Sequence, residues 1–172
     1  ILDDETYGEL KLRLSELGAL AIVEALTLLS LGPVTEVPQD EALVTYAAKV
    51  EREHAQVEWT QDGHAVSRRI RAYDPRPGAF TIHRGLDVKL YGVRVAMDAQ
   101  GEPGTVLGID ESGMLVACGA GGVRIAYVHP AGKRRLASLD WAQGRGIAVG
   151  DVLGTAAWAS RSASGAPSPG NR

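Results

Sequence analysis

The stretch QDEALVTYAAKVEREHAQVEW, residues Gln39 to Trp59, divides the chain into two parts of different character. Residues 1–61 carry 12 acidic and 4 basic side chains, a net charge of −8, and their apolar residues have helical spacing. Residues 62–172 carry 9 acidic and 14 basic side chains, a net charge of +5, and their short apolar runs are typical of strands. This asymmetry indicates an anionic partner for the second half or a basic face that is merely solvated.

Composition bounds the class of protein. A chain of 172 residues can bury one or two modest cores. The single cysteine, Cys118, excludes a disulfide framework within the chain and fits a reducing cytoplasm. The longest apolar stretch, Gly18 to Leu31, is interrupted by Glu24 and Thr27, so we expect it to fall short of the ~20 residues of a membrane span. The start is acidic, unlike a targeting segment, and Ile1 in place of methionine suggests a fragment of a longer protein.

The first part predicts helices. Thr6 and Glu9 form a capping box, which predicts a helix start. Apolar residues then recur on one face before Gly18 and on one face after it, and Gly32-Pro33 ends the pattern. These stripes are Leu10, Leu14 and Leu17, then Ile22, Leu26 and Leu29. They need a surface to cover them, and no sheet is predicted before the linker.

The second part predicts a small β-rich domain. A short β-prone segment, Leu43 to Ala47, lies within the linker, and a helix begins near Asp62 with Arg68 and Arg71 opposite its apolar face. The apolar alternation slips at Gly92, which predicts a β-bulge. Ser138 is expected to cap a helix through Gln143. The expected strands are Ala79 to His83, Leu86 to Ala96, Thr105 to Ile109, Met114 to Cys118, Val123 to Val128 and Val149 to Leu153.

Metal and phosphate-loop sites are not indicated. The histidines, His54, His64, His83 and His129, lack the spacing of zinc ligands, and Cys118 has no nearby thiol. The run Gly119 to Gly122 lies between two predicted strands with no helix after it, so it predicts a hairpin turn. We therefore expect no metal.

The basic residues are the candidate binding set, because cations contact an RNA backbone and flat side chains offer stacking surfaces. Tyr46, Trp59 and Tyr73 could stack on bases, but the apolar patterns around Trp59 and Tyr73 favour core positions. The expected cations are Lys49, Arg52, Arg68, Arg71, Arg76, Lys133, Arg134, Arg135 and Arg145.

Six segments together resemble one family. The run VTYAAKVEREHAQVEW resembles the linker of methionyl-tRNA formyltransferases, with its TYA-x-K segment and closing acidic residue and tryptophan. IRAYDPRPGAF at Ile70 to Phe80, PGTVL at Pro103 to Leu107 and HPAGKRRL at His129 to Leu136 are similar to later blocks of that family. DDETYGEL and KLRLSELGA resemble the helices that finish its catalytic domain. The resemblance covers Ile1 to about Gly154.

The resemblance implies an α+β fragment: N-terminal helices that form the tail of an α/β formyltransferase domain, followed by a small OB-like β-barrel. It implies three regions: closing helices at 1–38, a linker at 39–61 and a tRNA-binding barrel at 62–154. The Ala/Ser/Pro/Gly-rich composition of residues 155–172 predicts a disordered tail. Trp158 is the tail's one large apolar residue. The parent is expected to be a monomeric cytoplasmic enzyme without a membrane partner.

The same resemblance implies a division of labour. The parent enzyme transfers a formyl group from 10-formyltetrahydrofolate to the amino group of methionyl-initiator tRNA, using an asparagine, a histidine and an aspartate that lie upstream of Ile1 in the family's order. The fragment is therefore expected to bind tRNA, to hold no cofactor and to be inactive alone, with the missing catalytic domain as its second partner. His54, His64 and Asp4 do not replace the absent catalytic set.

Two alternatives stay open. The barrel could serve a sugar formyltransferase, where it would pack on its own enzyme, or it could be a structural appendage without nucleic-acid binding. The chain also departs from the family's pattern in its linker, turns and last loop, at Glu51, Glu53, Gln56, Arg76, Ala120, Gly146 and Val149. The linker departures dilute its positive charge, so they weaken its expected hold on tRNA.

Overall fold

The first element is one long helix, α1 (Tyr7–Leu31), in the computed structural model, which describes residues 1–154. The predicted capping box starts it: the Glu9 amide donates to Thr6 Oγ1 at 3.3 Å, and the Thr6 amide donates to Glu9 Oε2 at 2.9 Å. The expectation of two helices is wrong. Gly18 lies in open space, and the leucines and alanines around it are strong helix formers that carry the helix through the glycine.

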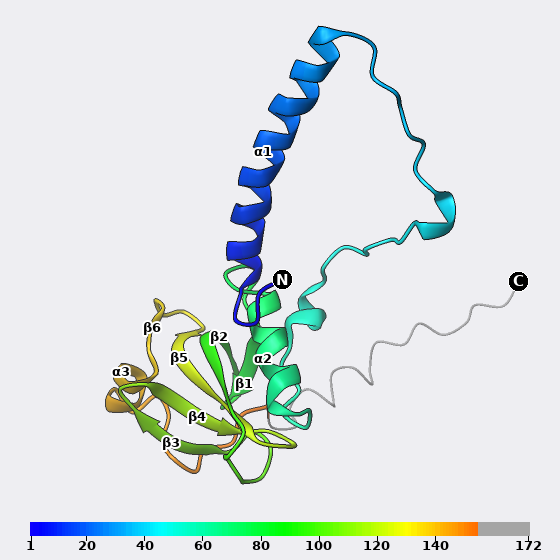
Figure 1. Cartoon of the computed structure of the whole chain (residues 1–172). Helices are drawn as coiled ribbons and strands as arrows, with labels where there is room; N and C mark the ends of the chain where they lie inside the picture. Colours follow the sequence, from blue (N-terminus) through cyan, green and yellow to red (C-terminus); the bar gives the residue numbers. More distant parts are fainter. Residues whose placement is uncertain (155–172) are drawn as a thin grey trace, which may run out of the picture.

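α1 projects away from the rest of the molecule (Figure 1), and none of its residues is buried. Its most apolar 18-residue window has a mean hydropathy of 1.7, so by length and composition the helix could cross a membrane. The expectation that this stretch is too short is therefore wrong, because Glu24 and Thr27 do not interrupt the helix. A helix that packs its apolar side on another protein passes the same test.

We expect α1 to be the least protected helix of a monomeric chain. An uncovered apolar surface of this size seeks another surface, so the purified chain should self-associate or leave Ile1 to Leu31 frayed. Sedimentation combined with amide hydrogen exchange checks this. A demonstrated monomer whose α1 amides exchange as slowly as those of the central strands would contradict it.

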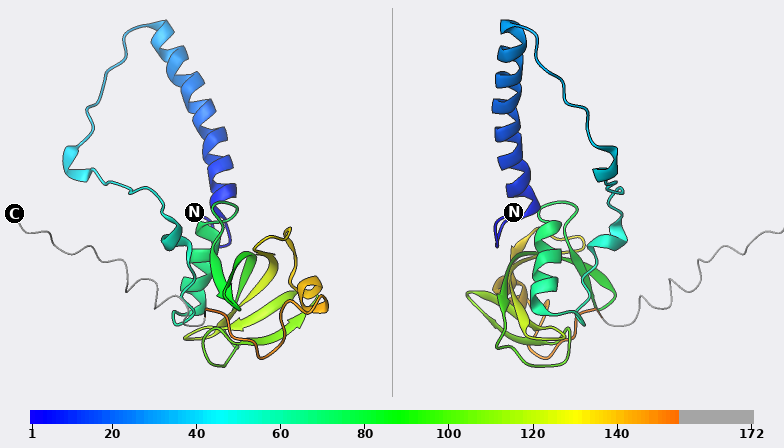
Figure 2. Two further views of the ribbon diagram at one scale, coloured as in Figure 1. Left: turned by 180° about the vertical axis from the view of Figure 1, so that it is seen from behind. Right: turned by 45° about the vertical axis from the view of Figure 1, so that its right-hand side comes forward.

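The chain returns from α1 through an extended segment that stands clear of the helix (Figure 2). It contains two short 3₁₀ helices, η1 (Glu41–Leu43) and η2 (Arg52–Ala55). The strand expected at Leu43 to Ala47 is absent, because no neighbouring strand lies beside this exposed segment to pair with its backbone.

The second part forms a helix and a sheet close to the expected positions. Asp62 caps α2 (Gly63–Ala72) by accepting a hydrogen bond from the Ala65 amide at 2.9 Å. The next elements are β1 (Phe80–His83), β2 (Leu86–Ala96), β3 (Val106–Asp110), β4 (Gly113–Ala117), β5 (Gly122–Pro130), β6 (Leu136–Ala137) and α3 (Ser138–Gln143). The predicted turn at Gly119 to Gly122 is confirmed, since it joins β4 to β5.

The six strands form one antiparallel sheet in the order β1-β2-β5-β4-β3, with β6 paired to β5. α2 packs on β2 and β5. The core lies between this helix and the curled sheet (Figure 1), and it includes linker residues Val57 and Trp59. Its fully buried members include Val66, Ile70, Val88, Leu90, Val106, Met114, Val116, Val123, Ile125 and Val128.

The β-bulge expected at Gly92 is wrong. Tyr91 pairs with Tyr127 and Val93 with Ile125, so the register of β2 against β5 is the same on both sides of Gly92. Gly92 has a φ of +63°, and the buried face of β2 switches there. β5 switches its buried face at the same level, so no residue is inserted. The observed register shift lies between β3 and β4, at Val106/Gly108.

Two expectations at the end of the chain are also wrong. Ser138 does not cap α3: its hydroxyl donates to the carbonyl of Ile125 at 2.7 Å, because a buried carbonyl needs a donor. Val149 to Leu153 does not form a strand, since a turn and a φ of +89° at Gly150 break the extended backbone. The sixth strand is β6 instead.

The segment from Gly150 to Gly154 nevertheless lies between the two edge strands of the sheet. The Val106 amide of β3 donates to Asp151 O at 2.9 Å, and the Gly150 amide donates to Val106 O at 2.8 Å. On the other side, the Gly154 amide donates to Ile82 O of β1 at 2.8 Å. The segment thus caps backbone groups that edge strands leave exposed. The expected tail at residues 155–172, with Trp158, lies outside the described residues.

Candidate nucleic-acid interface

Of the two predicted cations of the linker, one has no ion-pair partner and the other has one. Lys49 is exposed and makes no ion pair or side-chain hydrogen bond within residues 1–154. Arg52 forms an ion pair with Asp87, and its guanidinium lies over the Phe80 ring at 4.8 Å from the ring centre. Arg52 therefore attaches the linker to the sheet, which leaves it poorly placed to bind a second anion.

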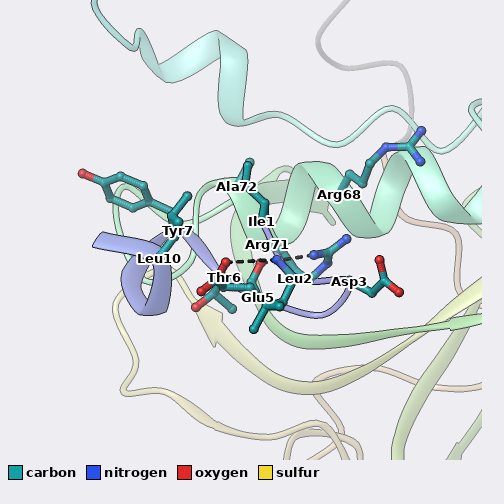
Figure 3. Close-up of a pocket in the computed structure, with 10 residues that line it drawn as sticks. All are labelled: Ile1, Leu2, Asp3, Glu5, Thr6, Tyr7, Leu10, Arg68, Arg71 and Ala72. Carbon is teal, nitrogen blue, oxygen red and sulfur yellow. Dashed lines mark hydrogen bonds between the residues drawn. The ribbon is translucent and has the colours of Figure 1, made fainter. Parts of the chain in front are cut away.

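The predicted cations of α2 lie beside the start of the chain. Arg68 is exposed, whereas Arg71 is half-buried and donates from Nη1 to the carbonyl of Glu5 at 3.1 Å. Figure 3 shows a pocket between α2 and the loop formed by Ile1 to Thr6. The Arg71 guanidinium reaches towards this loop, while the Arg68 guanidinium extends from α2 in another direction. Glu5 also binds Arg13 at 2.8 Å, and this bond holds the pKa of Glu5 at about 2.

The tribasic loop contains three exposed cations, Lys133, Arg134 and Arg135, of which one is held against aromatic rings. The Arg135 guanidinium lies 4.2 Å from the centre of the Tyr91 ring and 5.0 Å from that of Tyr127. Lys133 and Arg134 are exposed and have no ion pair within residues 1–154. Arg135 therefore attaches the loop to the sheet, and Lys133 and Arg134 are left without an ion-pair partner in the described residues.

The Asp74–Pro77 turn approaches this loop through Tyr91. Gly78 lies so close to the Tyr91 hydroxyl that a Cβ there would be 2.6 Å from it. Burial raises the pKa of Asp74, and the positive charge of Arg135 acts in the opposite direction. Arg76 is exposed on this turn. Arg76, Lys133 and Arg134 thus belong to one neighbourhood, whereas Arg145 is exposed after the end of α3.

Some basic residues were not expected from the sequence. Arg69 donates to the carbonyls of His54 and Gln56, both at 3.1 Å, so it anchors the linker on α2. Arg94 of β2 is exposed and lines a cavity with Arg68 and Arg71. The change of buried face at Gly92 was the signal that could have placed Arg94 on the outside.

The aromatic candidates separate as the apolar pattern predicted. Trp59 is 5% exposed, and its Nε1 donates to Thr81 Oγ1 at 2.9 Å. Tyr73 is half-buried against the core. Tyr46 is 96% exposed on the extended segment, so of the three it alone is free to stack on a base.

No group of three or more metal-ligating side chains occurs in the part of the chain that the structure describes. Cys118 is buried, and burial raises its pKa to about 11, so it stays a protonated thiol. His83 is buried edge-on against Trp141, with its Nε2 3.5 Å from Asp151 Oδ2. Burial lowers the pKa of His83, although Asp151 opposes the shift and Arg84 adds to it.

We expect His83 to make the chain less stable in mild acid. Because its folded pKa lies below the ordinary value of 6.5, the unfolded chain binds more protons once the pH falls below about 6.5, and stability is lost from there downwards. Urea unfolding of the native chain and of a His83→Asn variant between pH 7.5 and 5 measures this. The variant should show a shallower fall in unfolding free energy, and parallel curves would exclude the effect.

Taken together, the described residues form a curled antiparallel sheet with α2 packed on it, and exposed cations lie on its loops and on α2. The family model described as the C-terminal domain of formyl transferases matches residues 49–146. The chain belongs to this family, and the resemblance expected from the linker is confirmed.

Curated relatives support the same family assignment. Methionyl-tRNA formyltransferase of Magnetococcus marinus is 38% identical over 149 residues, which are 87% of this chain and 47% of that protein. That of Geotalea daltonii is 40% identical over 151 residues, 88% of this chain and 48% of the relative. The chain spans about half the length of the curated relatives it matches.

Solved structures share the fold. HypX from Aquifex aeolicus is 26% identical with a TM-score of 0.63, over 76% of this chain and 23% of that protein. A second HypX structure, in complex with tetrahydrofolic acid, has 28% identity and a TM-score of 0.60, over 69% of this chain and 21% of HypX.

Proposed function

We propose that this chain is the tRNA-holding part of a methionyl-tRNA formyltransferase, which formylates methionyl-initiator tRNA in the cytoplasm for translation initiation. The observation that carries the proposal is the match of 87–88% of the chain to methionyl-tRNA formyltransferases of Magnetococcus marinus and Geotalea daltonii, while the chain spans less than half of each. The chain supplies binding and positioning, and the other half of the protein supplies catalysis.

The proposed contact surface comprises the exposed cations around the Asp74–Pro77 turn and the tribasic loop. Arg76, Lys133 and Arg134 are exposed there, while Arg135 holds the loop against Tyr91 and Tyr127. Such cations bind phosphates of the RNA backbone and fix its position, with little choice among base sequences. Lys49 and Arg145 are also exposed and would contact an RNA that extends beyond these two loops.

We further propose that the sheet is an OB-like barrel whose last seam is the segment from Gly150 to Gly154. Its hydrogen bonds to Val106 of β3 and Ile82 of β1 support this, because they connect the two strands at the ends of the sheet order. A barrel without free edges gives the basic loops a rigid base.

The formyl donor, 10-formyltetrahydrofolate, is proposed to bind outside this chain. The pocket in Figure 3, of about 480 Å³, is lined by carboxylates and guanidinium groups together, so it does not by itself select an anionic folate. His54 Nδ1 accepts a hydrogen bond from the Glu51 amide at 3.1 Å within the linker, and it faces no nucleophile there. We derive no step of formyl transfer through these residues.

The matched region is only 23% of HypX, so we consider a second candidate, in which the domain packs on the rest of its own enzyme and binds no tRNA. A sugar formyltransferase or a purely structural role makes the same prediction. Titration of the purified chain with tRNA at about 50 mM and about 200 mM salt separates these functions. Binding that is strong at low salt and weak at high salt supports the tRNA role, and no binding at low salt would exclude it.

A further inference from the structure

A cavity of about 710 Å³ lies between α2, β2 and the first residues of the chain. Its wall contains three arginines from two rigid elements, Arg68 and Arg71 of α2 and Arg94 of β2. Two carboxylates of the N-terminal segment, Asp3 and Asp4, line the same cavity. Figure 3 shows Asp3 beside the Arg71 guanidinium, on the side where Arg68 leaves the helix.

Two of these arginines differ from Arg84 and Arg124 in their partners. Arg84 and Arg124 form ion pairs with Asp151 at 3.2 Å and Asp110 at 2.8 Å. Arg68 and Arg94 make no ion pair or side-chain hydrogen bond within residues 1–154. Their donors are therefore available, although carboxylates lie in the same cavity.

Arg71 adds a donor that is already desolvated. Its Nε is buried and has no hydrogen-bond partner among the described residues, while its Nη1 is held by the Glu5 carbonyl. A buried N–H without an acceptor carries a desolvation cost that an anion would remove. The bond to Glu5 keeps the guanidinium plane fixed, which lowers the entropy lost when an anion binds.

We propose that this cavity binds one phosphate of the RNA backbone, through Arg71 and Arg94 with Arg68 at the rim. Guanidinium groups form paired hydrogen bonds with phosphate oxygens. The three arginines and two aspartates of the cavity leave a net charge of about +1, which matches the single negative charge of a phosphodiester. Asp3 and Asp4 oppose the phosphate, so they tune the affinity of the site. This inference rests on the proposed function and adds a contact point on the far side of α2 from the extended segment.

The test compares two neutral substitutions that change the charge equally. Arg94→Gln removes a donor of the cavity, and Arg124→Gln is the matched control, because Arg124 is the cross-strand partner of Arg94 but is engaged by Asp110. We expect Arg94→Gln to reduce the slope of log affinity for tRNA against log salt by about 0.7 to 0.9, and Arg124→Gln to leave it unchanged. Asp3→Asn with Asp4→Asn should raise the affinity at low salt.

A direct readout is the NMR signal of the arginine Nε–H groups. Adding tRNA should shift the signals of Arg71 and Arg94 and leave that of Arg84 in place. Equal slopes for Arg94→Gln and Arg124→Gln, with unshifted Arg71 and Arg94 signals in a chain that still binds tRNA, would overturn this site and leave the proposed function intact. A native chain that binds no tRNA would overturn both.

Discussion

A Trp59→Ala variant is expected to lose about 3–5 kcal/mol of unfolding free energy, a large part of the ~5–15 kcal/mol that such domains possess. Trp59 is 5% exposed in the core, and its Nε1 donates to the buried Thr81 hydroxyl at 2.9 Å. Gly104 and Gly154 pass close to its ring, so the segment between the two edge strands loses its support with it. The loss combines a cavity with an unpaired buried hydroxyl.

Denaturant unfolding followed by circular dichroism measures this loss. Trp59→Phe should fall between the native chain and Trp59→Ala, because it keeps most apolar burial and loses the hydrogen bond. Tyr46→Ala is the matched aromatic control, since Tyr46 is 96% exposed on the extended segment. Unfolding midpoints that coincide for Trp59→Ala and Tyr46→Ala would contradict the core position of Trp59.

The chain alone is expected to form no detectable formyl-methionyl-tRNA. Residues that act as a catalytic unit lose nearly all rate enhancement together, on the order of 10⁵-fold or more, when the unit is missing. The assay supplies 10-formyltetrahydrofolate and methionyl-tRNA, with the full-length Geotalea daltonii relative as positive control. Folate-dependent formylation by the chain, above that of a heat-denatured sample, would contradict the proposed role in binding alone.

The sequence predicted the sheet better than the segments around it. Gly and Pro punctuation located five of the six strands and α2, because turns have strict backbone requirements that local residues reveal. The failures depended on distant contacts. The Ser138 hydroxyl donates to the carbonyl of Ile125, 13 positions away. Gly92 permits β2 to change its buried face, and β5 changes its buried face at the same level. Neither relation is visible in a local pattern.

The candidate site was predicted as a list of cations and not as a surface. The sequence could not show that Arg52 pairs with Asp87 or that Arg135 stacks on Tyr91, because these partners lie 35 and 44 positions away along the chain. It also omitted Arg94, whose neighbours in the sequence are the apolar Val93 and Val95. The fold determines which arginines have an ion-pair or stacking partner, and the sequence alone does not show it.

The measurement that most directly tests the tRNA-holding role is the salt dependence of tRNA affinity for three chains. They are the native chain, a Lys133→Gln/Arg134→Gln variant and an Arg84→Gln/Arg124→Gln control with the same change of charge. We expect the native affinity to fall by roughly 0.7–0.9 log units per phosphate contact for each tenfold rise in salt, and the first variant to lose about two contacts from this slope. The control should keep the native slope, because its arginines are engaged by Asp151 and Asp110. Equal slopes for the native chain and the Lys133→Gln/Arg134→Gln variant would contradict the account.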